Sequence, residues 1–152
     1  MDKTKVIEHH LDFIEFARVL RAFDEELLRK PITEGKWSIV EIIGHLIAWD
    51  KFILRDRIPY FFSENTFPAG PDVAALNERA AASARGRAVA IVLAEFSDGR
   101  TQLVEILKGM PNELWVAEIQ INQSKLTLCS YFQGLMEHDL HHLAQMKEMI
   151  KS

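Results

Sequence analysis

Cysteine is almost absent from this sequence of 152 residues, in which Cys129 is the single example. A lone cysteine cannot form a disulfide within the chain, so packing must hold the fold together, as is usual in a reducing cytoplasm. Long apolar stretches are missing as well. None approaches the roughly 20 residues that a helix needs to cross a bilayer, and no apolar signal region follows the N-terminal residues. We therefore expect a cytoplasmic protein without a membrane partner.

The sequence also lacks an excess of basic residues. It has 18 Lys and Arg against 22 Asp and Glu, which gives a net charge of −4 and a pI of about 5.9. Nucleic-acid binding depends on clustered Lys and Arg that contact phosphates. The charge balance therefore argues against a nucleic-acid partner, while a local site for a small anion stays open.

Alternating strand patterns, repeats and low-complexity tracts are absent, whereas helical periodicity dominates. The length suggests one domain over residues 1–152. Four long amphipathic segments are predicted to be helices, the first capped by Thr4, the second by a Ser38–Glu41 capping box and the fourth by Thr127. They span residues 4–28, 39–57, 73–108 with a break at 85–87, and 128–150.

Residues 58–72 form a long connection in which Pro59, Pro68 and Pro71 prevent a continuous helix. A crossover of about 15 residues lets the second and third helices run in the same direction. The predicted fold is therefore all-α, a four-helix bundle with up-down-down-up topology. The aromatic residues of the connection are expected to cap one end of the bundle, to line a pocket mouth or to contact another subunit.

Three histidines stand where the helical pattern asks for a hydrocarbon. His138 and His142 are four residues apart in the last helix, which places them on one face at a spacing that suits binding of one metal ion. His45 lies within the apolar face of the second helix, between Ile42 and Trp49. A buried imidazole without a partner costs about 1–3 kcal/mol, so three of them should share a reason. The alternative is that they are core residues hydrogen-bonded to neighbours.

Other polar residues receive simpler interpretations. His9 is expected to be solvated, His10 to be partly exposed beside the apolar stripe of the first helix, and His141 to lie on the flank of the last helix. Glu41 and Gln145 are candidates for binding the second ring nitrogen of a ligand histidine, although Glu41 is more simply a capping residue. Four arginines are expected on a solvated helix face: Arg79, Arg85, Arg87 and Arg100.

A set of these residues resembles the DinB-like superfamily of four-helix proteins. The residues are, in chain order, Pro31, Trp37-Ser38, Glu41, His45, Trp49 and Glu137-His138-x-x-x-His142. The superfamily includes metal-dependent hydrolases and bacillithiol- and mycothiol-dependent transferases. The resemblance implies that His45, His138 and His142 together hold a divalent metal ion, with Zn or Ni as the first choices.

The function expected from this resemblance is metal-dependent hydrolysis of a small molecule, or transfer of a low-molecular-weight thiol to it. The alternative is a non-catalytic protein of the same fold that binds a small molecule or protects against stress. Relatives and the aromatic connection make a homodimer reasonable. No residue stands out as the general base, so the catalytic residues stay unassigned.

Overall fold

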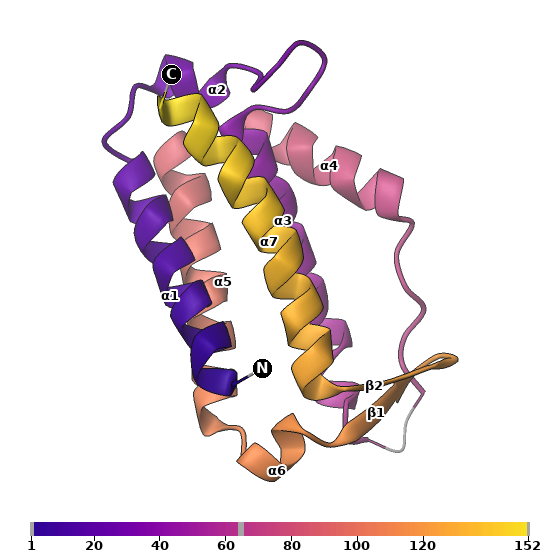
Figure 1. Cartoon of the computed structure of the whole chain (residues 1–152). Coiled ribbons are helices and arrows are strands. Elements are labelled where there is room, and N and C mark those ends of the chain that lie inside the picture. The colour runs from indigo at the N-terminus through magenta and orange to yellow at the C-terminus, as the bar shows by residue number, and fades with distance from the viewer. Residues whose placement is uncertain (1, 64–65, 152) are drawn as a thin grey trace.

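The computed structural model describes residues 2–63 and 66–151. Figure 1 shows that two of the four long helices run upward (α1 and α7) and two downward (α3 and α5), which confirms the predicted up-down-down-up bundle. α1 packs against α5, and α3 packs against the same helix. The four bundle helices are α1 (Lys3–Leu20), α3 (Ile39–Asp56), α5 (Val89–Gly109) and α7 (Leu128–Lys151).

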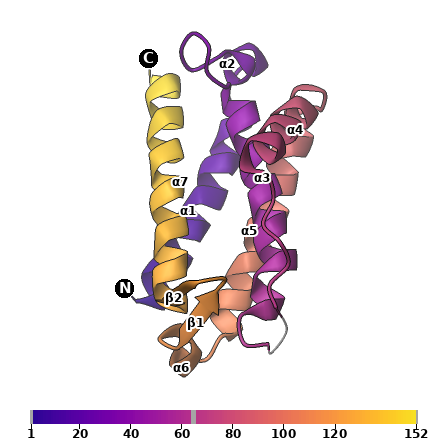
Figure 2. The ribbon, with the colours of Figure 1, turned by 90° about the vertical axis from the view of Figure 1, so that its right-hand side faces the viewer.

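The crossover between α3 and α5 is longer than predicted. It contains the short helix η1 (Ile58–Tyr60) and the full helix α4 (Val73–Arg85), which packs against α3 (Figure 2). The two helices approach closely at Gly44, where an added Cβ would lie 2.5 Å from the Cβ of Ala84. The predicted helices on either side of the break at residues 85–87 are confirmed, but the first belongs to the crossover and only the second is a bundle helix.

The expected first helix also divides into two. α1 ends at Leu20, and a short helix, α2 (Glu25–Arg29), begins after Asp24. The side chain of Asp24 accepts a hydrogen bond from the amide of Glu26 and so caps the start of α2. The apolar pattern of the sequence continues across this break and does not reveal it. The N-cap of α1 is Asp2, whose carboxylate accepts from the amide of Thr4, and Thr4 is not the cap.

The connection before α7 contains strands that the sequence did not predict. After α6 (Asn112–Trp115), β1 (Glu118–Ile121) and β2 (Ser124–Thr127) form an antiparallel hairpin. Asn122 supports the tight turn with a φ of 55°. Strands of four residues are too short to show a clear alternation. The two other predicted caps are confirmed: the Glu41 amide donates to Ser38 Oγ at 3.2 Å, and the Ser130 amide donates to Thr127 Oγ1 at 3.1 Å.

The buried apolar residues form two separate clusters. One includes Phe13, Ile43 and Phe96, and the other includes Leu103 and Phe132. Aromatic residues of the connection after α3 join the second cluster, which lies nearer the hairpin end of the bundle. Among the described residues, no helix combines the length and apolarity needed to cross a membrane.

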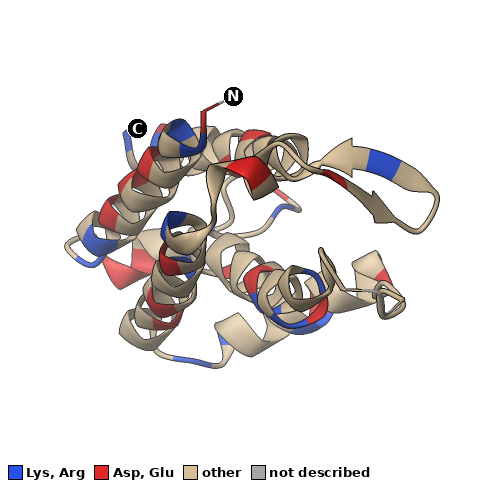
Figure 3. Cartoon of the chain, turned by 90° about the horizontal axis from the view of Figure 1, so that it is seen from below, with Lys and Arg blue, Asp and Glu red and all other residues tan. Residues whose placement is uncertain are grey.

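A layer of buried polar residues lies between these two clusters, and each bundle helix contributes to it. In each of the four bundle helices, a residue of one apolar cluster lies about one turn before the polar residue. A residue of the other cluster lies about one turn after it. Most other charged residues are exposed or partly exposed, and Figure 3 shows both basic and acidic positions on the helices. The buried polar layer consists of His9, His10, Asp50, Arg100 and Asp139.

Candidate metal centre

The three predicted histidines meet between α3 and α7. One potential ligand atom from each of His45, His138 and His142 lies within 4.8 Å of the others. The ring centroids of His45 and His142 are 4.7 Å apart, and those of His138 and His142 are 4.6 Å apart. The helix register, which periodicity alone could not determine, therefore places all three side chains at one height.

Their burial differs from the expectation that all three replace core hydrocarbons. His45 is buried at 3% exposure, His142 is half-buried and His138 is exposed. His138 and His142 lie at the edge of the apolar stripe of α7 and face α3, whereas His141 is exposed, as expected for a flank position. The buried residues of α7 are Leu128, Phe132, Met136, Asp139, Leu143 and Met146.

Hydrogen bonds orient two of the three rings. Nδ1 of His45 lies 2.5 Å from the carbonyl oxygen of Ile42, and Nδ1 of His142 lies 3.0 Å from Oε1 of Gln145. Both oxygens accept, so each Nδ1 carries the ring proton and each Nε2 presents a lone pair. Gln145 is thus a ring-nitrogen partner, as predicted. Glu41 is not, because it accepts from the Ser38 amide and from Arg85.

The environment keeps these rings neutral. Burial lowers the pKa of His45 to about 4, against the opposing effect of the Ile42 carbonyl. Burial also lowers the pKa of His142, although its bond to Gln145 acts in the opposite direction. Neutral imidazole is the form that binds metal ions. At neutral pH His45 and His142 therefore have their Nε2 lone pairs available.

This donor set fits a divalent ion. Two imidazole nitrogens at about 2.1 Å from a tetrahedral Zn ion stand about 3.4 Å apart. The potential ligand atoms of the three histidines lie within 4.8 Å of one another, which is close to that spacing. Imidazole nitrogen is a good ligand for Zn, Ni, Cu and Fe alike. The ring of Trp37, whose centroid lies 4.8 Å from that of His45, packs beside the site.

A cavity of about 280 Å³ lies next to the three histidines. Side chains from α1, α3, α4, α5 and α7 line it, and most of the surface that they present to it is apolar. Its polar lining residues are His10, His45, Asp50, Asn77, Arg100, Tyr131, His138 and Asp139. Residues of the candidate metal site and of the buried polar layer therefore share one cavity.

Arg100 is the centre of the polar layer. Its Nη1 and Nη2 donate to the two carboxylate oxygens of Asp139 at 2.6 and 2.9 Å, and its Nε donates to Asp50 at 2.7 Å. Nη1 also lies 3.2 Å from Nδ1 of His10. His9 donates from Nε2 to Asp139 at 2.9 Å. One guanidinium thus joins α5 to α1, α3 and α7.

The pKa values of the two carboxyl groups in this layer are shifted in opposite directions. Burial raises the pKa of Asp50 to about 6, because the nearby Arg100 compensates it only in part. For Asp139 burial acts in the same direction, but the bidentate contact with Arg100 outweighs it and holds the pKa well below its usual range. Asp139 is therefore a permanent carboxylate, whereas Asp50 is able to take up a proton near neutral pH.

A second group of possible ligands, His9, His10 and Asp139, has potential ligand atoms within 4.8 Å of one another. Arg100 already holds both oxygens of Asp139, and a metal ion there would face its positive charge. His9 also uses its Nε2 to donate to the same carboxylate. This group is a hydrogen-bonded network, and it does not offer a second metal site.

The predictions for His9, His10 and Arg100 are wrong. His10 is 1% exposed, Arg100 is 3% exposed and His9 is buried, whereas all three were expected on partly or fully solvated surface. The missed signal is periodicity: Phe96, Arg100 and Leu103 continue one apolar stripe, so the charge stands at a core position. In α1 the buried stripe likewise contains both histidines.

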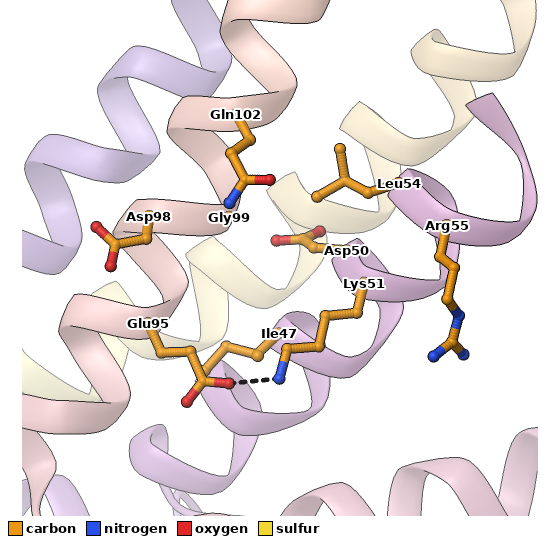
Figure 4. A pocket seen from close by; sticks show the side chains of 9 residues that line it. All are labelled: Ile47, Asp50, Lys51, Leu54, Arg55, Glu95, Asp98, Gly99 and Gln102. Atoms are coloured by element: carbon orange, nitrogen blue, oxygen red, sulfur yellow. Dashed lines mark hydrogen bonds and ion pairs between the residues drawn. The ribbon is translucent and has the colours of Figure 1, made fainter. Parts of the chain in front are cut away.

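A second groove lies between α3 and α5 and has a volume of about 380 Å³ (Figure 4). Nζ of Lys51 and Oε1 of Glu95 form an ion pair across it at 2.7 Å. Asp50 lines both this groove and the cavity beside the histidines, so its carboxyl group lies between them. The groove contains none of the three clustered histidines and is therefore not the candidate metal centre.

Comparison with known proteins agrees with this arrangement. A family model described as the DinB superfamily matches residues 14–146, which include all three histidines. The chain belongs to the DinB superfamily. The comparison with curated proteins gives no match.

Among solved structures, this DinB-superfamily chain is similar to YfiT from Bacillus subtilis, described as a probable metal-dependent hydrolase with an unusual four-helix bundle topology. The TM-score is 0.77, and the match covers 98% of this chain and 86% of YfiT. Sequence identity is 16%, so this likeness establishes the fold and no more.

Proposed function

We propose that the chain binds one divalent ion, Zn or Ni as first choices, through one ring nitrogen each of His45, His138 and His142. The observation that carries this proposal is the convergence of three imidazoles from two helices, with two of the Nδ1 atoms already donating to oxygen acceptors. Acceptors that fix the ring orientation are typical of histidines that ligate metals. Membership of the DinB superfamily supports this proposal, as does the description of YfiT, which shares the fold, as a probable metal-dependent hydrolase.

The proposed reaction is hydrolysis of a small molecule, or transfer of a low-molecular-weight thiol to one. Three protein ligands leave a coordination position open. A divalent ion held there supplies Lewis-acid activation of a nucleophile, either water or a thiol. The adjacent cavity gives the substrate a mostly apolar environment beside the histidines. Asp50 is our candidate for the proton acceptor, because it lines this cavity and its pKa is about 6.

The alternative function is non-catalytic binding of a small molecule in the same cavity. It is favoured by the state of Asp139, the carboxylate next to His138 in sequence. Arg100 and His9 occupy both of its oxygens, so it is not available as a base. If Asp50 fails to accept a proton during a reaction, no carboxylate of the described polar layer can replace it.

Elemental analysis of the full chain, purified without an affinity tag, tests the site. We expect about one Zn or Ni per chain, lost in His45→Ala, His138→Ala and His142→Ala. His141→Ala is the matched control, since His141 is an exposed neighbour on the same helix. Failure of the wild type to take up added Zn or Ni, or equal loss in the control, would contradict the assignment. Assays with esters, amides and thiol–electrophile pairs then separate hydrolysis, thiol transfer and binding without turnover.

A further inference from the structure

The cavity beside the three histidines has one polar wall that is incompletely hydrogen-bonded. His10 lines the cavity, and its Nδ1 lies 3.2 Å from Nη1 of Arg100. Its Nε2 is buried and has no hydrogen-bond partner among the described residues. Buried polar atoms in folded proteins are nearly always paired, so an orphan of this kind calls for an explanation.

Arg100 decides which nitrogen of His10 carries the proton. A guanidinium has donors only, so Nδ1 of His10 must accept and the ring proton must be on Nε2. Burial, reinforced by Arg100, lowers the pKa of His10 to about 3. The ring therefore stays neutral around physiological pH. His10 presents a neutral N–H donor whose orientation is held by a buried charge.

The rest of the cavity restricts what such a donor can bind. Its volume of about 280 Å³ is roughly twice that of an engineered protein cavity that holds benzene, so a molecule of about a dozen non-hydrogen atoms fits. Asp50 and Asp139 give the polar layer two carboxyl groups against one guanidinium. An anionic ligand would meet these carboxylates, which favours a neutral acceptor. The remaining lining is mainly aliphatic and aromatic.

We propose that this cavity binds a small neutral molecule with an aromatic or otherwise apolar body and a carbonyl oxygen, and that Nε2–H of His10 donates to that oxygen. His45 and His138 line the same cavity, so the bound molecule lies beside the candidate metal centre. The inference thus names a substrate class for the proposed function and rests on it for the chemistry. Binding itself needs no metal.

Two probes of nearly equal shape test the proposal. Acetophenone has a carbonyl oxygen where α-methylstyrene has a methylene group, so the pair differs mainly in the acceptor. Both are titrated by NMR into the full-length protein, with and without added Zn. We expect acetophenone to bind roughly three- to tenfold more tightly, as for one neutral hydrogen bond in a buried site. Its addition should shift the side-chain ¹⁵N signals of His10, and α-methylstyrene should shift them much less.

Three variants assign the preference to His10. His10→Leu removes the donor and should abolish the difference between the two probes. His10→Gln should retain most of it, because an amide can accept from Arg100 through oxygen and donate through nitrogen. His141→Leu is the control, since His141 is exposed and does not line the cavity, and it should bind both probes like the wild type.

Equal binding of both probes to the wild type would overturn the proposal, as would an unchanged preference in His10→Leu. If His10→Leu does not fold, the His10 ¹⁵N shifts in the wild type decide the matter. Measurements without metal separate this inference from the proposed function. Lack of Zn uptake would remove the metal site, while a carbonyl preference in the metal-free protein would stand.

Discussion

Replacement of Arg100 by methionine should destabilise the protein mainly through charge. Arg100 is 3% exposed, and it donates two hydrogen bonds to Asp139 and one to Asp50. Methionine fills much of the same space but leaves two buried carboxyl groups without their cation. Removal of one partner from a buried ion pair typically costs about 3–5 kcal/mol. For a chain of this size that loss lowers the Tm by about 6–20 °C.

The pH dependence of this loss identifies its cause. Without Arg100, burial raises the pKa of Asp50 and Asp139 in the folded protein above their unfolded value of about 3.9. A raised carboxyl pKa penalises the folded state above the unfolded pKa, and the penalty disappears as the groups are protonated at low pH. The deficit of Arg100→Met relative to wild type should therefore be smaller at pH 4.5 than at pH 7.

Urea unfolding followed by circular dichroism measures the free energy of unfolding at both pH values. Adding Asp50→Asn and Asp139→Asn to Arg100→Met should recover part of the loss, because the uncompensated charges are gone. Arg79→Met on the exposed face of α4 is the control and should change stability by no more than about 0.5 kcal/mol. A deficit that is equal at pH 4.5 and pH 7 and unaffected by the Asn substitutions would refute the electrostatic argument and point to packing.

Two further predictions concern His10 and Gly44. The folded-state pKa of His10, about 3, lies below its unfolded value of 6.5, so its contribution to stability is complete above pH 6.5 and is lost as the pH falls towards 3. Urea titrations measure the free energy of unfolding at pH 7 and at pH 5. Between these pH values His10→Gln should lose about 2 kcal/mol less of this free energy than the wild type. An unchanged pH profile would show that the pKa of His10 is not lowered in the folded protein. Gly44→Ala should cost about 1–3 kcal/mol, because its Cβ would overlap that of Ala84. A double-mutant cycle with Ala84→Gly should give a coupling of about 1 kcal/mol or more, whereas additive effects would place the strain elsewhere.

The bundle topology could be predicted because its signals are local. Proline residues and a capping box marked the ends of α3, and the long connection required a crossover. The place of α4 in the crossover was harder to predict, since only a short break at residues 85–87 separates its helical pattern from that of α5. Contacts with α3 show why α4 belongs to it and not to α5: Gly44 approaches Ala84 closely, and the indole N–H of Trp49 donates to Asn77. Tertiary contacts of this kind leave little trace in periodicity.

The candidate metal centre could be predicted for a different reason. His45, His138 and His142 are neutral residues whose spacing relates them to one another, and the family resemblance linked the two helices. Arg100 was misjudged because a charged residue on a helix is most often solvated. Its partners come from three other helices, so no spacing within α5 reveals them.

The polar layer has a consequence for the alignment of the helices. Hydrocarbon clusters tolerate sliding, because one apolar side chain can replace another. A shift of α3, α5 or α7 by one turn, about 5.4 Å, would instead place Asp50, Arg100 or Asp139 among hydrocarbon side chains without a polar partner. We therefore expect the buried polar layer to fix the axial position of α7 relative to α3. His138 flanks Asp139 in the chain, so the same alignment sets the height at which it meets His45. The geometry of the candidate metal centre therefore depends on the ion pairs of the buried polar layer.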